Sequence, residues 1–239
     1  MLFDLTPRTH RPDSTWFGAG LIPLVPSLGP SLGPGLVLGL VLGLGMTLGA
    51  TGAHAAGLTV QVTDANGVPL PDAVIYAEPV GSSTQPKPAK PVEIEQKGRK
   101  FAPPVTVIQV GSEVSFPNND TVRHHVYSFS TPKVFELKLY SGTPGSPILF
   151  DKPGTVVVGC NIHDQMLAYI HVVNTPYFGR TDATGKVHLD SIPPGKYNLK
   201  FWHYKMPAPN QIQEQPLVMS ATDASAAFKA GAKPAAAPN

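Results

Sequence analysis

The stretch Gly159-Cys160-Asn161-Ile162-His163-Asp164-Gln165-Met166 decides how the chain is interpreted. It follows the apolar run Thr155-Val156-Val157-Val158, which is typical of a buried β-strand. Between Cys160 and Met166 it combines the single cysteine of the protein with an imidazole and a thioether. We therefore predict a strand that ends in a metal-binding loop.

The donor types of this loop favour one metal. Two imidazoles, one thiolate and a weak axial methionine make up the donor set of a blue-copper electron-transfer site. The loop supplies Cys160, His163 and Met166, and the pair His124-His125 upstream offers the missing imidazole. Zinc could use the same donors. Structural zinc sites, however, favour several Cys or His, and catalytic ones keep a position open for water, so a bulky thioether argues against both. The prediction is one copper ion that cycles between Cu(I) and Cu(II).

The ligand spacing also carries a family resemblance. Cys-x-x-His-x-x-Met, paired with the earlier pattern Asn118-Asn119-x(4)-His124-x-Val126, resembles the cupredoxins, and the loop spacing is similar to that of amicyanin. More closely, the stretches 118–130, 135–154 and 159–178 resemble the cupredoxin-like methylamine-utilisation proteins of bacteria. The resemblance implies a Greek-key β-sandwich over residues 92–177. It also implies a full ligand set, which is His124, Cys160, His163 and Met166.

His125 departs from the family pattern. Cupredoxins usually carry at this position an Asn that hydrogen-bonds near the thiolate, so the resemblance implies that His125 supports the site without binding the ion. Consecutive strand residues point to opposite faces, so His124 and His125 cannot both face the ion unless a bulge intervenes. The alternative is that His125 points outward as a solvated residue.

Composition limits the fold and the partners. Only 14% of the residues are charged, and the 27 prolines and 23 glycines favour short strands joined by turns. Period-two alternation recurs between these turns without a convincing helical period, which predicts an all-β protein. The formal net charge is +2 with no basic stripe, so nucleic acid is not an expected partner.

The first 55 residues are typical of a signal peptide. Arg8 and Arg11 precede an apolar run from about Leu36 to Leu48, and Ala53-His54-Ala55 supplies a cleavage site of small residues. We therefore predict export to the periplasm, with an uncleaved membrane anchor as the alternative. A lone cysteine in an oxidising compartment is either a buried inert residue, a reactive thiol or a metal ligand, and the His and Met beside Cys160 favour the ligand.

Two further segments flank the predicted copper domain. The pattern from Val62 to Val74 and the pattern from Thr181 to His203 resemble the two halves of a carboxypeptidase-regulatory-like β-sandwich. The predicted organisation is a first half with a linker over 57–91, the cupredoxin domain over 92–177, a second half over 178–219 and a disordered tail over 220–239. The alternative is that the flanking strands enlarge a single cupredoxin sandwich.

The expected function is one-electron transfer to or from a redox partner protein in the periplasm. Two rivals remain open, namely a copper carrier or buffer, and a structural β-module without a redox role. We do not expect an enzyme. Asp164 could act as a general base, but no nucleophile lies near it in the sequence, and the chain lacks the further His clusters of a multicopper site. Nothing in these residues recognises an amine, so a link to methylamine utilisation rests on the resemblance alone.

Overall fold

The computed structural model describes residues 55–82, 91–206 and 212–231. All of these residues belong to one compact unit, residues 50–239. The regular elements in the described ranges are strands, so none of them provides a helix that could cross a membrane. The prediction of an all-β protein built from β-sandwiches is confirmed.

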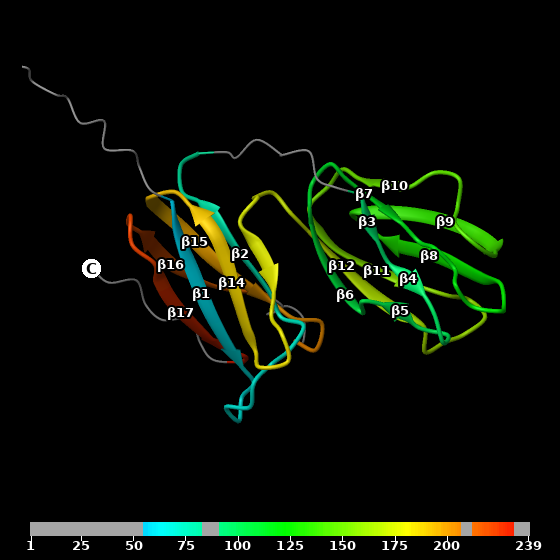
Figure 1. The fold of residues 1–239 in the computed structure, drawn as a ribbon, viewed down its shortest axis with the longest axis horizontal. Coiled ribbons are helices and arrows are strands. Elements are labelled where there is room, and N and C mark those ends of the chain that lie inside the picture. Colours follow the sequence, from blue (N-terminus) through cyan, green and yellow to red (C-terminus); the bar gives the residue numbers. More distant parts are fainter. Residues whose placement is uncertain (1–54, 83–90, 207–211, 232–239) are drawn as a thin grey trace, which may run out of the picture. The chain divides into compact units, whose positions relative to one another are not determined.

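Strands β3 to β12 form the inner sandwich, coloured green to yellow-green in Figure 1. One sheet has the strand order β6-β12-β11-β8-β9 and the other has the order β10-β7-β3, with β4 and β5 as a separate short pair. The bounds in chain order are β3 Val92–Glu93, β4 Glu95–Gln96, β5 Phe101–Ala102, β6 Val105–Gln109, β7 Ser112–Ser115, β8 His124–Ser130, β9 Lys133–Tyr140, β10 Ile148–Phe150, β11 Gly154–Gly159 and β12 Leu167–Val173.

Alternating residues build the core of the inner sandwich. In β11, Val156 and Val158 are fully buried, whereas Val157 between them is exposed. The buried valines pack in one cluster with large side chains that include Phe116 and Phe150 from the opposite sheet and its flanking loop. Because successive side chains of a strand point to opposite faces, this alternation directs one face of β11 into the core and places the following loop at the end of the sheet.

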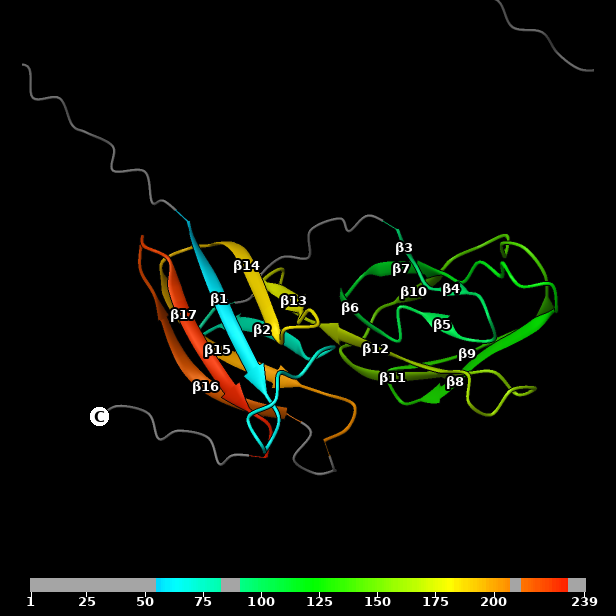
Figure 2. The same cartoon turned by 60° about the horizontal axis from the view of Figure 1, so that its bottom comes forward.

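Strands β1, β2 and β13 to β17 form the outer sandwich. Its two sheets have the orders β14-β1-β17 and β13-β2-β15-β16, and Figure 2 shows β1 between β14 and β17. The bounds are β1 Ala56–Thr63, β2 Val74–Pro79, β13 Phe178–Arg180, β14 Lys186–Ile192, β15 Gly195–Trp202, β16 Ile212–Met219 and β17 Ala224–Lys229.

The outer strands do not extend the sheets of the inner sandwich. Segments before and after the inner sandwich pair directly, as in Leu58 opposite Leu189 and Ala77 opposite Leu199. They enclose a separate hydrophobic core, which includes Leu58, Ile75 and Phe201. A chain that leaves this sandwich after β2 and returns at β13 therefore folds the inner sandwich as an insertion. The likeness of the outer strands to a carboxypeptidase-regulatory-like unit stays a prediction.

The predicted disordered tail over 220–239 is wrong in its first half. Strand β17 pairs in parallel with β1, and Phe228 is buried in the outer core with its ring 5.4 Å from that of Phe201. Its three alanines and one serine carry little hydrophobic signal, so the period-two pattern depends on Phe228 alone. Residues 232–239 lie outside the described residues, as do most of the predicted signal peptide (1–54) and most of the predicted linker (83–90).

A third cluster of buried residues joins strands of both sandwiches. Val74, Tyr76 and Trp202 from the outer strands pack with Val105 and Val173 from the inner strands. His171 of β12 is also buried here, with its ring stacked on Trp202 at 4.7 Å. Burial lowers the pKa of His171 from 6.5 to about 4.

This buried histidine predicts a loss of stability in acid. The unfolded chain takes up a proton on His171 below pH 6.5, whereas the folded protein does so only near pH 4, so stability falls as the pH falls through this window. At about 1.4 kcal/mol per pKa unit, the expected loss is about 3 kcal/mol. Urea unfolding of the metal-free protein at several pH values measures it. His171→Gln should remove most of this pH dependence, whereas the exposed His188→Gln should retain it, and equal slopes for both variants would contradict the assignment.

Candidate metal centre

Three of the predicted ligands meet at one end of the inner sandwich. His124 begins β8, Cys160 directly follows β11, and His163 lies in the loop between β11 and β12. The Sγ atom of Cys160 is 3.9 Å from Nδ1 of His124 and 4.0 Å from Nδ1 of His163. All three ligating atoms lie within 4.8 Å of one another. Among the described residues this is the one group of His, Cys and carboxylate side chains found at metal-binding distances.

These distances are compatible with one metal ion between the donors. A first-row metal with bonds of about 2.3 Å to sulfur and about 2.0 Å to nitrogen separates the two donors by about 3.5 to 3.7 Å. The observed separations of 3.9 and 4.0 Å exceed this by a few tenths of an ångström, so small side-chain shifts bring the donors to bonding distance. His₂Cys is the donor set that copper uses in electron-transfer sites.

Sheet pairing positions the cysteine. Gly159, the last residue of β11, pairs with Leu167 on one side and with Tyr127 of β8 on the other. The ligand loop therefore leaves and re-enters the sheet between adjacent strands. A side chain at Gly159 would begin 3.2 Å from the Tyr127 ring, so glycine allows that ring to cover the backbone just before Cys160.

The three clustered donor residues differ in their exposure to solvent. His124 and Cys160 are buried, at 0% and 3% exposure, whereas His163 is half-buried. The neighbouring side chains of Ile162 and Leu167 are exposed. The site is therefore held from inside by His124 and Cys160 and reaches the surface at His163.

Met166 is fully buried in the same core cluster as Cys160. Its backbone N–H donates a hydrogen bond of 2.9 Å to the carbonyl of His163, which closes the ligand loop into a tight turn. The backbone thus ties the predicted axial residue to the loop that carries the other ligands. The coordination of the metal by its thioether stays a prediction.

Replacing Met166 with leucine is expected to have a mild effect. Leucine has a similar volume, so the change should cost less than about 1.5 kcal/mol of stability. A weak axial ligand tunes the reduction potential more than it holds the ion, so copper should remain bound at a shifted potential. Copper content and voltammetry of the variant test this expectation, and a site emptied of copper would show that Met166 is a principal ligand.

His125 lies on the other face of β8. Its Nε2 atom is 2.9 Å from a carboxylate oxygen of Glu136, and its ring is 5.3 Å from that of Tyr127. The pairing of β8 with β9 shifts register between His124 and Val126, yet the ring of His125 still contacts residues other than the ligands. The structure thus brings His124 to Cys160 and places His125 beside Glu136. A supporting role of His125 beside the thiolate stays a prediction.

Two polar residues at the site were not predicted to support it, although Asn118 belongs to the family pattern. Asn118 donates hydrogen bonds from its side-chain amide to the carbonyls of Val122 and Tyr140, which ties the loop before β8 to the end of β9. Asp120 places a carboxylate oxygen 2.7 Å from Nε2 of His124. Spacing alone could not identify Asp120, because a carboxylate four residues before a histidine is common in loops and has no fixed direction there.

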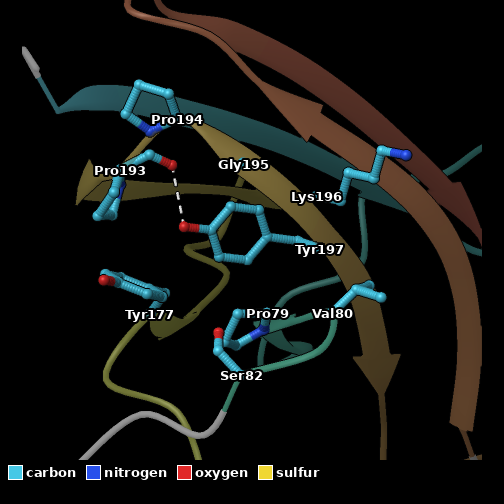
Figure 3. A pocket seen from close by; sticks show the side chains of 9 residues that line it. All are labelled: Pro79, Val80, Ser82, Tyr177, Pro193, Pro194, Gly195, Lys196 and Tyr197. Atoms are coloured by element: carbon cyan, nitrogen blue, oxygen red, sulfur yellow. Dashed lines mark hydrogen bonds between the residues drawn. The ribbon is translucent and has the colours of Figure 1, made fainter.

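A hollow on the outer sandwich, away from the metal centre, is shown in Figure 3. This cavity of about 290 Å³ is lined mainly by proline and tyrosine side chains. The hydroxyl of Tyr197 donates a hydrogen bond of 2.9 Å to the carbonyl of Pro193, which fastens the turn before β15. Its described lining contains no His, Cys, Asp or Glu, so it adds no ligand to the metal centre.

Comparisons with known proteins give partial matches to copper proteins. No family model and no curated protein sequence matches the chain. Among solved structures, a Cu-containing nitrite reductase from Thermus scotoductus is 26% identical with a TM-score of 0.34, and the match covers 48% of this chain and 28% of that enzyme. A purple cupredoxin from Nitrosopumilus maritimus is 20% identical with a TM-score of 0.31, covering 34% of this chain and 99% of that protein. Amicyanin from Paracoccus versutus is 19% identical with a TM-score of 0.31, covering 36% of this chain and 85% of that protein.

Proposed function

We propose that the protein is an exported copper protein that transfers one electron at a time. The observation that carries the proposal is the close cluster of His124, Cys160 and His163 at the end of a β-sandwich. Copper bound there would supply the change between Cu(I) and Cu(II). The chain would hold the donors in nearly the same positions in both states, because two of them are buried and the loop leaves and re-enters one sheet.

The exposure of the ligands supports electron transfer over catalysis. Burial of Cys160 and His124 keeps water and substrates from the inner side of the ion. The half-buried His163, next to the exposed side chain of Ile162, offers a short route to a partner protein. Export to the periplasm and a redox partner there belong to the same proposal and are supported by the leader sequence.

The exposed edge of the site also favours a second candidate function. A half-buried His163 could release its metal to an acceptor, which is what a copper carrier or buffer requires. The two functions differ in their rates. An electron-transfer protein exchanges electrons quickly and retains its copper, whereas a carrier gives up Cu(I) to an acceptor within the time of an encounter.

The decisive experiment is copper loading of the mature protein. Electron transfer predicts an intense visible thiolate-to-copper band, an EPR spectrum with a small copper hyperfine splitting, and fast electron exchange with a soluble redox protein. Rapid transfer of copper to a Cu(I) chelator with slow electron exchange would favour the carrier. Absence of copper binding would leave the structural β-module.

A further inference from the structure

Among the described side chains, Asp120 makes the shortest polar contact to the side chain of a predicted ligand. It lies in the loop between β7 and β8, and its Oδ2 atom is 2.7 Å from Nε2 of His124. The side chain of His124 is fully buried, and that of Asp120 is 13% exposed. The other ring nitrogen of His124, Nδ1, faces Sγ of Cys160 at 3.9 Å. One histidine therefore joins a carboxylate on one side to the thiol on the other.

The backbone of a neighbouring turn holds this carboxylate in place. The N–H of Gly98 donates to Oδ1 at 2.6 Å, and the N–H of Arg99 donates to Oδ2 at 2.9 Å. Both residues have positive φ, 60° and 58°, in the turn between β4 and β5, which aims two successive N–H groups at one side chain. Together with the contact to His124, these two hydrogen bonds occupy both carboxylate oxygens of Asp120 and fix the orientation of its side chain.

An ionised carboxylate can only accept hydrogen bonds, whereas a neutral imidazole has one N–H and one lone pair. The contact with Asp120 therefore requires the hydrogen of His124 on Nε2. This leaves the lone pair on Nδ1, directed towards Cys160. His163 has no corresponding carboxylate contact among the described hydrogen bonds and ion pairs. The two imidazoles therefore differ in their contacts. The buried ring of His124 lies between Asp120 and Cys160, whereas His163 contacts only Cys160 in this way among the described residues.

We propose that Asp120 is a positioning residue of the metal centre, which holds His124 in the Nε2–H tautomer with its Nδ1 lone pair ready for the metal. The proposal rests on the proposed copper function for its metal, but the tautomer itself belongs to the metal-free protein. A carboxylate behind a histidine ligand also increases its electron donation. Asp120 should therefore favour Cu(II) and lower the reduction potential.

Nitrogen-15 NMR of the imidazoles in the metal-free protein, at a pH where they are neutral, tests the tautomer directly. We expect His124 to be protonated at Nε2 in the wild type and to become a mixture of tautomers in Asp120→Ala. A wild-type His124 protonated at Nδ1, or an unchanged tautomer in the variant, would overturn the proposal. Because this measurement needs no copper, its result does not depend on whether the proposed copper function is correct.

Copper binding gives the second readout. Loss of a support of this kind typically weakens metal affinity by about 10- to 100-fold, and we expect this weakening, with a higher reduction potential, in Asp120→Ala and Asp120→Asn. Asp164→Ala is the matched control, because it removes an exposed carboxylate next to His163 from the ligand loop. Equal losses of copper affinity for the Asp120 and Asp164 variants would show that only the loss of negative charge matters, and would contradict the positioning role of Asp120. Circular dichroism verifies the fold, and if Asp120→Ala fails to fold, Asp120→Asn and the wild-type tautomer still decide the question.

Discussion

Replacing Cys160 with serine is expected to abolish the intense visible absorption of the copper-loaded protein. The band requires a thiolate bound to copper, and a serine hydroxyl is a poor copper ligand of nearly the same size. Copper affinity should fall by more than about 100-fold, since loss of a ligand exceeds the loss of an outer support. Cys160 is buried, so the new hydroxyl should also cost about 1–3 kcal/mol of stability without unfolding the sandwich.

Absorption spectra, copper content and circular dichroism together test this expectation. Asn161→Ser is the matched control, because it introduces the same residue at the next, exposed position of the loop. The control should keep both the band and the copper. A Cys160→Ser protein that retained the visible band would show that the thiol is not a ligand, and the copper proposal would then fail.

The adjacent histidines should respond to alanine substitution in opposite ways. His124→Ala should lose the visible band and most of the bound copper, because Nδ1 of His124 is one of the three clustered donor atoms. His125→Ala should keep the band, because its Nε2 is paired with Glu136 on the other face of β8. A small shift in potential or weaker retention of copper is expected for His125→Ala, through the neighbouring ring of Tyr127.

His125→Ala thus serves as the matched control for His124→Ala. Both variants lose an imidazole from a buried position of one strand, so a general effect on folding should appear in both. The visible spectrum and the copper content of the two proteins give the answer. The reverse outcome would place His125 at the metal and move the register of β8 by one residue, with every side chain of the strand on the other face.

Much of the inner sandwich could be predicted because its information is local. The spacing of Cys160, His163 and Met166 defines a loop, and the alternation in Val156-Val157-Val158 defines the strand before it. Both patterns act within a few residues, where strand geometry fixes the directions of side chains. Strand geometry likewise predicts that His124 and His125 face opposite sides, but it does not say which of them meets the thiol, and only the family resemblance favoured His124.

These local patterns could not predict contacts between segments that are distant in the sequence. The role of Asp120 depends on the turn at Gly98 and Arg99, more than twenty residues away along the chain, which supplies the two N–H groups that hold its carboxylate. Strand β17 could not be recognised either, because its alanines carry little signal and its place beside β1 is set by a partner more than 160 residues earlier. The sequence by itself determined the donor types, their loop and the β class, since these follow from local chemistry and a short period. The tertiary structure alone decided what supports His124 and which strands close the outer sandwich, since these depend on chain segments brought together by packing.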